Sequence, residues 1–261
     1  MSIERAVNDA TADDNRRFVI VHYHLFKNAG TSVDKALKAA VGDRWASIEA
    51  GHGDQRLSPS ALRNFIDNRP EVLAVSSHTA MIKPQDLGED LRVIPIVFLR
   101  HPLDRMRSAY DFERRQGADT LGSRMARTLS FPEYVRFFIR HGRSRSFRNF
   151  QTHRLAAAAP DKGDSELERA LAALELLPHV GVVERYSHSI RQYEQLIRSY
   201  LPGFQLAPRH ENVGGRHGLA PEARLKEIRT AMGPELHEEA TQENLQDLQI
   251  WERSILLAQS P

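Results

Sequence analysis

Short apolar segments alternate with longer segments of helical period along most of the chain. Four stretches rich in β-branched and aromatic residues predict buried strands, at 18–26, 71–78, 91–100 and 179–186. Apolar residues at helical spacing predict helices over 32–41, 58–68, 102–116, 131–140, 166–176 and 187–200, with two more at the C-terminal end. This alternation predicts an α/β fold in which helices cover both faces of a central parallel sheet.

The pattern also indicates how the chain is organised. Residues 1–16 are polar and predict a disordered lead-in, and residues 17–261 predict a single domain. The longest stretches without a clear period, 141–165 and 203–221, are rich in arginine and histidine. Irregular segments of that length inside a compact domain are typical of functional loops.

Composition narrows the classes of function. The chain has no cysteine, which excludes disulfides, thiolate catalysis and cysteine zinc sites. The net charge of +2 is too small to indicate a nucleic-acid partner. No segment approaches the length of an apolar membrane span, and the N-terminus lacks a signal-like apolar core. We therefore expect a cytoplasmic protein with no nucleic-acid partner and no membrane span, and the oligomeric state stays open.

Three polar residues each follow the end of a predicted strand. Lys27, His78 and Arg100 stand directly after apolar segments. In parallel sheets, ligands bind beyond the carboxyl ends of the strands. If these strands are parallel neighbours, the three side chains lie at the same edge of the sheet.

The segment after the first strand has the properties of an anion site. Lys27 is followed by a small polar turn and then a helix, the turn being Asn28, Ala29, Gly30, Thr31 and Ser32. Backbone N–H groups at a helix start lack partners, and the helix dipole favours negative charge there. The lysine precedes the glycine, so the motif is not a Walker A sequence. A tight turn with a solvent-facing lysine remains the alternative.

A second anion site is predicted in "LRHPLDRMRSAY" (99–110). Helical spacing places Ser108 on the face that looks back towards Arg100. A guanidinium fork, a hydroxyl and a helix start together suit a phosphate group. The alternative is a strand-end arginine that caps a neighbouring helix. Two anion sites at one edge indicate a ligand with separated phosphate groups.

These segments resemble the sulfotransferases that use 3′-phosphoadenosine 5′-phosphosulfate (PAPS). "HLFKNAGTS" (24–32) is similar to their 5′-phosphosulfate loop, and residues 99–110 are similar to their 3′-phosphate motif. "VSSHTAM" (75–81) resembles the segment with the catalytic histidine in heparan 2-O-sulfotransferases. Residues 146–156 and 179–196 are similar to further stretches of the family, whose bacterial members this chain resembles. The likeness covers about residues 18–215.

The resemblance implies a P-loop-NTPase-like fold and an enzyme that transfers the sulfuryl group of PAPS. The sequence has no H-E-x-x-H or comparable ligand spacing, so no metal is expected. The acceptor would be a hydroxyl, or an amine, of a carbohydrate, a glycolipid or a small molecule. Lys27 would stabilise the developing charge, and His78 would act as the general base. The implied PAPS-binding residues are those of the loop 27–32, with Arg100, Ser108, Asn212 and Arg216. The arginine-rich region predicts an acceptor wall with Arg114, Arg148 and Gln151, or else a solvated charge run.

The chain departs from the family pattern at four positions. Asn28 replaces a threonine and His101 an aspartate. Ser77 stands where a glycine precedes the histidine, and Met81 replaces a tyrosine. The last two favour a non-catalytic nucleotide-binding relative as one alternative, and a P-loop phosphotransferase that needs ATP and magnesium is another. The identity of the acceptor is left open.

Overall fold

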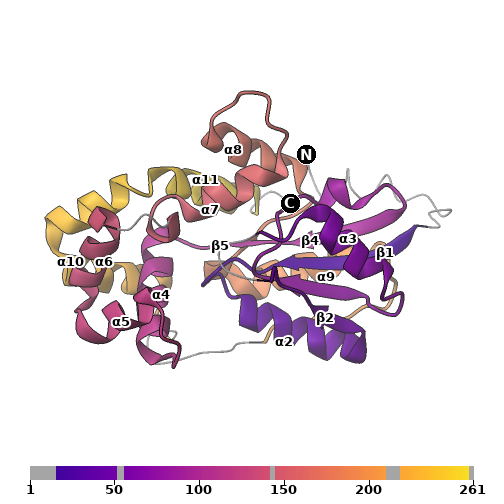
Figure 1. Cartoon of the computed structure of the whole chain (residues 1–261), viewed down its shortest axis with the longest axis horizontal. Coiled ribbons are helices and arrows are strands. Elements are labelled where there is room, and N and C mark those ends of the chain that lie inside the picture. The colour runs from indigo at the N-terminus through magenta and orange to yellow at the C-terminus, as the bar shows by residue number, and fades with distance from the viewer. Residues whose placement is uncertain (1–15, 52–55, 142–144, 210–217, 259–261) are drawn as a thin grey trace.

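A parallel sheet forms the centre of the protein (Figure 1). The computed structural model describes residues 16–51, 56–141, 145–209 and 218–258. Among these residues, the main sheet has the order β2-β3-β1-β4, with every neighbouring pair parallel. The strands are β1 (Arg17–Tyr23), β2 (Trp45–Ser47), β3 (Ala74–Ser77) and β4 (Leu91–Ile96). One residue beyond β4, β5 (Phe98–Leu99) pairs in parallel with β6 (Gly181–Val182).

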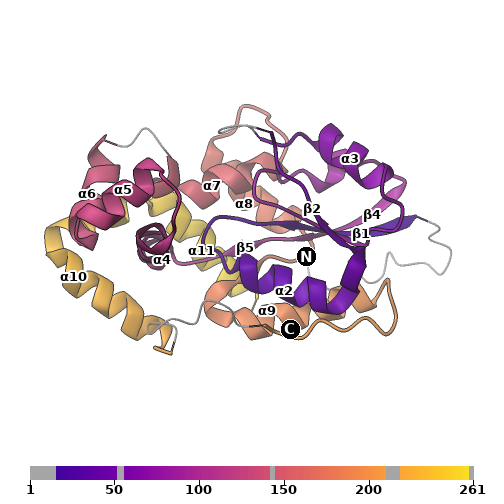
Figure 2. The ribbon, with the colours of Figure 1, turned by 60° about the horizontal axis from the view of Figure 1, so that its bottom comes forward.

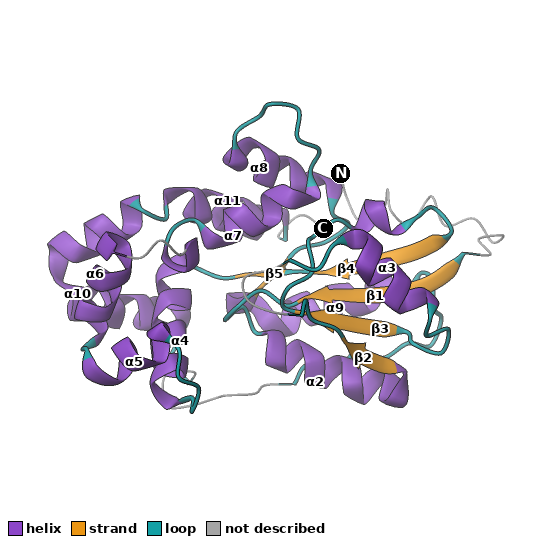
Figure 3. Ribbon diagram, in the orientation of Figure 1, coloured by secondary structure: helices purple, strands orange, loops and turns teal. Residues whose placement is uncertain are grey.

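Helices cover both faces of this sheet, which confirms the predicted α/β class (Figure 3). One face packs against α2 (Gly30–Val41) and α9 (Tyr186–Arg198). The opposite face packs against α3 (Pro59–Asp67), α7 (Phe150–Leu155), α8 (Glu166–Leu176) and α11 (Leu245–Leu257). The sheet therefore has an apolar core on each side.

A helical layer stands beyond the carboxyl ends of the strands (Figures 1 and 2). It contains α4 (Pro102–Arg115), α5 (Leu121–Thr128), α6 (Phe131–His141) and α10 (Pro221–Gln242). These helices share a core of their own, in which Tyr110, Tyr134 and Phe138 are buried. A kink divides α10 at Gly233, where φ is 73°, just before Pro234.

The alternation of side chains along β1 determines which residues meet which helices. Val19, Val21 and Tyr23 belong to the core under α3 and α8. Ile20 belongs to the opposite core, under α2 and α9. Successive side chains of a strand point to opposite faces. His22 therefore shares the face of Ile20 and turns towards α2.

Several predicted boundaries differ from the structure. The predicted strand 91–100 is interrupted at Val97, and the predicted strand 179–186 is extended only at Gly181–Val182, since a 3₁₀ turn and α9 follow. The stretch 141–165 is not irregular throughout, because α7 and flanking 3₁₀ turns occupy much of it. Besides α7, the elements β2 and α5 were not predicted. None of the helices in the described ranges is both long and apolar enough to span a membrane.

Candidate functional site

The carboxyl edge of the sheet brings together the three residues predicted to lie there. Lys27 follows β1 and His78 follows β3, and these two strands pair in parallel. Arg100 follows β5, which continues from β4 after one residue and pairs in parallel with β6. Arg100 Nη1 donates a hydrogen bond to the Lys27 carbonyl oxygen at 3.1 Å. The His78 ring stacks on that of His24, with centroids 3.7 Å apart. The predicted convergence thus agrees with the strand topology and with direct contacts.

The loop between β1 and α2 presents backbone N–H groups. Lys27 and Ala29 have left-handed conformations, with φ of 65° and 61°, and Ala29 is the N-cap of α2. The N–H groups of Ser32 and Val33 bond to the Ala29 carbonyl at 2.9 and 3.1 Å. Within the described chain, those of Gly30 and Thr31 have no backbone acceptor. Unpaired donors at a helix start are suited to an anion.

Asn28 holds this loop in place with its side chain. The amide is buried and donates to the Phe98 carbonyl and to Gln151 Oε1, both at 2.7 Å. Gln151 is itself fully buried, and its amide also bonds the backbone N–H and C=O of Arg100, each at 2.8 Å. Gln151 therefore links the loop to the end of β5, in an interior position rather than at a surface open to an acceptor.

The other two residues of the predicted acceptor wall lie apart from Gln151. Arg114 is exposed on α4 and donates to the Tyr110 hydroxyl at 3.0 Å. Arg148 forms an ion pair with Glu243 at 3.0 Å. The structure thus does not gather the three into one surface. Asn212 and Arg216, predicted to contact the nucleotide, lie outside the described residues.

Lys27 is a partly buried cation beside aromatic rings. Its ammonium lies 4.3 Å from the centroid of Phe112 and 5.9 Å from that of Phe26. Burial, together with the charges of Arg100 and Arg115, lowers the pKa of Lys27 to about 8. No carboxylate of the described chain forms an ion pair with it. A bound anion would supply the missing negative charge.

Arg100 belongs to a buried cluster that joins α10 to the sheet edge. Its guanidinium pairs with Asp104 at 2.8 Å, and Arg224 of α10 pairs with the same carboxylate at 3.1 Å. Two guanidinium groups share one carboxylate, so the cluster carries a net charge of +1 from these three groups. Ser108 lies one helical turn beyond Asp104, on the same face of α4 and partly exposed. Arg100 and Arg224 therefore bring two guanidinium groups to the predicted 3′-phosphate position.

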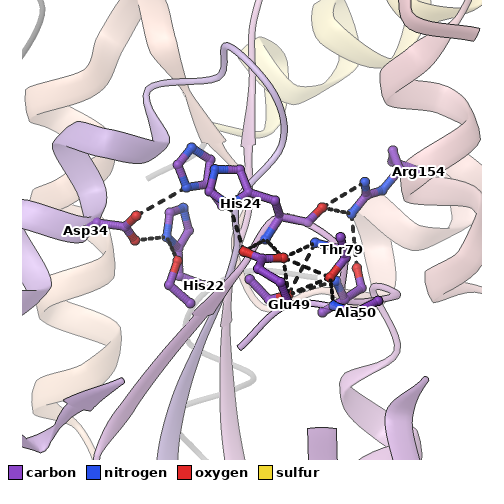
Figure 4. Close-up of polar contacts among 11 residues, drawn as sticks. His22, His24, Asp34, Glu49, Ala50, Thr79 and Arg154 are labelled. Carbon is purple, nitrogen blue, oxygen red and sulfur yellow. Dashed lines mark hydrogen bonds and ion pairs between the residues drawn. The ribbon is translucent and has the colours of Figure 1, made fainter. Parts of the chain in front are cut away.

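A second polar cluster lies between β1 and α2 (Figure 4). Asp34 contacts His22 Nδ1 at 2.7 Å and His24 Nδ1 at 3.2 Å, and His22 Nδ1 also lies 3.0 Å from the Ser76 hydroxyl. Burial acts to raise the pKa of Asp34, but the hydrogen bonds with both histidines outweigh it and hold the pKa well below its ordinary value. Burial lowers the pKa of His24 to about 4. His24 is therefore neutral at physiological pH.

His78 is oriented by the carboxylate of Glu49, which Figure 4 shows beside Thr79. Glu49 Oε1 lies 2.7 Å from His78 Nδ1 and accepts the His78 backbone N–H at 2.9 Å, while Oε2 accepts the Thr79 hydroxyl at 2.8 Å. Arg154 donates to the His78 carbonyl at 3.1 Å. When Nδ1 donates to the carboxylate, the lone pair is on Nε2. The His78 side chain is 55% exposed.

The carboxylates of these clusters were not predicted from the sequence. Asp34 and Glu49 lie on other elements than the histidines that they contact, His22 and His78. Asp104 lies one helical turn after its partner, Arg100. The sequence did indicate the two histidines of the Asp34 cluster. His22 and His24 alternate onto one strand face and were predicted as core or supporting groups. Both are buried, in agreement with that prediction.

His22, His24 and Asp34 are also the described residues whose spacing would suit a metal ion. One ligand atom from each lies within 4.8 Å of the others. The same carboxylate satisfies both imidazoles by hydrogen bonding, so the cluster is also complete as a polar network. The expectation of a metal-free site stays a prediction, which the binding experiment below tests.

Comparison with known proteins gives a relative but no activity. No protein-family model matches the chain. A protein of Archaeoglobus fulgidus, described as an uncharacterized protein, is 34% identical over 245 residues, which cover 92% of this chain and 96% of the relative. The chain belongs to the family of that archaeal protein. The two proteins are thus similar over nearly their full lengths.

We expect Gly30→Ala to destabilise the protein, although alanine is the better helix former. A Cβ at residue 30 would lie 1.9 Å from two atoms of the His24 ring, which is held by Asp34. Helix propensity favours alanine by about 1 kcal/mol, whereas overpacking costs about 1–3 kcal/mol. Thermal unfolding should show a lower melting temperature. Gly117→Ala is the control, because nothing lies within 4 Å of its added Cβ. Equal melting temperatures for both variants would contradict the contact.

Proposed function

We propose that the protein is a sulfotransferase that transfers the sulfuryl group of PAPS to a hydroxyl of a carbohydrate, glycolipid or small-molecule acceptor. The supporting observation is the joint position of three groups at one sheet edge. The Lys27 loop, the Arg100 cluster and the His78–Glu49 pair are connected by direct contacts. In the proposed fold, which is P-loop-NTPase-like, two of these groups bind the nucleotide and the third serves the acceptor.

The two anionic groups of PAPS are assigned to two cationic groups of the protein. The free N–H groups of Gly30 and Thr31, with the Lys27 ammonium, bind the 5′-phosphosulfate. The guanidinium groups around Asp104 bind the 3′-phosphate, with Ser108 as an additional donor. Neither group requires a metal ion to neutralise the ligand, and both lie at the carboxyl ends of parallel strands.

His78 serves the acceptor in this proposal. Glu49 holds Nδ1–H, so Nε2 takes the proton of the acceptor hydroxyl as its oxygen forms a bond to sulfur. The bond from sulfur to the phosphate oxygen breaks, and adenosine 3′,5′-bisphosphate leaves with that electron pair. Lys27 stabilises the charge on the departing oxygen. The neutral His24 ring stacks on His78 and adds no positive charge that would oppose its protonation.

The proposed function predicts that adenosine 3′,5′-bisphosphate binds in the presence of EDTA. The Lys27 loop and the Arg100 cluster supply the cationic groups that a metal would otherwise provide. Isothermal titration calorimetry of the full chain should give one saturable site, with similar affinity in EDTA and in magnesium. ATP with magnesium is the control ligand, which a phosphotransferase would bind instead.

Loss of nucleotide binding on chelation would contradict the metal-free site and would favour a metal at His22, His24 and Asp34. Binding that is intact without turnover would favour a non-catalytic nucleotide-binding protein. A screen with ³⁵S-labelled PAPS across sugars, glycolipids and small alcohols distinguishes that outcome, because transfer to any acceptor demonstrates the reaction.

A further inference from the structure

A pocket lies where the start of α4 meets α10 and α11, on residues that the proposed reaction does not use. It has a volume of about 340 Å³, within the range of pockets that bind small molecules. Both halves of α10 contribute to its wall, with Lys226 and Arg229 before the kink and His237 after it. His101, the N-cap of α4, and Leu248 of α11 also line the pocket.

The charged side chains that line this pocket are positive. Lys226 and Arg229 line the pocket, and no carboxylate is among the described residues that do so. Neither cation forms an ion pair or a side-chain hydrogen bond with another described residue. The positive end of the α4 dipole lies at the same place, beside His101. An anion would therefore meet two unpaired cations.

The two histidines supply hydrogen bonds rather than further charge. Burial lowers the pKa of His101 to about 4, and burial together with Arg229 lowers the pKa of His237. His101 Nδ1 accepts the Leu103 N–H at 3.3 Å, and its ring packs edge-on against Trp251. His101 is thus fixed in position at the pocket wall.

The remaining wall is apolar. Three leucine side chains, from α4, α10 and α11, contribute to it. A cavity of roughly 150 Å³ holds one benzene ring, so this pocket has room for two fused rings. Cations on one side and leucines on another suit a ligand with an acidic group on an apolar body.

We propose that this pocket binds a small organic anion, an aromatic or aliphatic sulfonate or carboxylate, at a site separate from the nucleotide edge. The inference does not depend on the proposed sulfotransferase activity. The site would lie next to the Arg100 cluster without including it, because His101 and Leu225 adjoin Arg100 and Arg224 in the chain.

Calorimetry of the full chain with 2-naphthalenesulfonate tests the proposal. We expect one saturable site that persists when adenosine 3′,5′-bisphosphate is present in excess. Lys226→Gln combined with Arg229→Gln should weaken binding about tenfold or more through the loss of charge-assisted hydrogen bonds. The neutral 2-naphthalenesulfonamide should bind the parent protein and this double variant equally.

The control removes the same charge elsewhere. Lys162→Gln combined with Arg191→Gln changes two exposed cations outside the pocket and should leave the affinity unchanged. Leu248→Trp should block both ligands by filling the pocket, with a melting temperature measured to show that the variant is folded. Absence of saturable binding, displacement by the nucleotide, or equal weakening in the two double variants would overturn the proposal.

Discussion

Replacement of His78 by alanine is expected to lower sulfuryl transfer by about 10²-fold or more and to leave nucleotide affinity nearly unchanged. The histidine is half-exposed, and its only side-chain hydrogen bond within the described chain is with Glu49. His78 follows β3, whereas Lys27 and the N–H groups of Gly30 and Thr31 follow β1. Removal of the base should therefore affect the chemical step and not the binding of the nucleotide.

Initial rates and calorimetric titrations of the same preparations check this result. Glu49→Gln should retain part of the activity, because the glutamine still accepts a hydrogen bond from Nδ1 but gives no charge to the imidazolium. His188→Ala, an exposed histidine on α9, is the control.

Near-parental turnover in His78→Ala would place the base elsewhere. His24 would then be the first candidate, because its ring stacks on His78 and lies against Gly30. Its pKa of about 4 makes it a weak base in the free protein, so the pH profile would also move to lower pH. The two outcomes are thus separable by the rate and by its pH dependence.

The class of fold and the common edge were predictable because they depend on local patterns. Apolar segments of strand length predicted β1, β3 and β4, and the parallel topology then placed Lys27, His78 and Arg100 together. The assignment of residues 27–32 as an anion site came from their own composition, and it stays a prediction. No long-range contact had to be known for these steps.

The supporting carboxylates depend on register and could not be predicted in this way. Asp34 meets His22 only because β1 turns that histidine towards α2, and a shift of one residue would reverse its face. Glu49 reaches His78 from the end of β2, a strand of three residues that the pattern did not reveal. Gln151 resembled an acceptor contact in sequence, and its burial follows from α7, which the pattern also did not indicate.

Lys27→Met is expected to raise the melting temperature of the free protein while it weakens nucleotide binding and lowers turnover. The folded-state pKa of Lys27 is about 8, against an ordinary value of 10.5. Between these values the unfolded state binds more protons, so the contribution of Lys27 to stability rises with pH. Below pH 8 the folded protein bears the full cost of the buried charge. Methionine removes that charge and keeps an unbranched side chain beside Phe112, although the cation–π contact is lost.

Whereas the melting temperature should rise, turnover and nucleotide affinity should fall. Loss of a group that stabilises developing charge costs about 10²–10³ in turnover. In the proposed complex the ammonium also contacts the nucleotide before the reaction, so the affinity for adenosine 3′,5′-bisphosphate should fall as well. Thermal unfolding at pH 7, with and without nucleotide, measures the change in stability and the change in nucleotide affinity. Initial rates measure the change in turnover. Lys35→Met, an exposed lysine on α2, is the control. If Lys27→Met leaves affinity and turnover unchanged, Lys27 belongs only to a tight strand–helix turn, and the anion site at the start of α2 loses its main support.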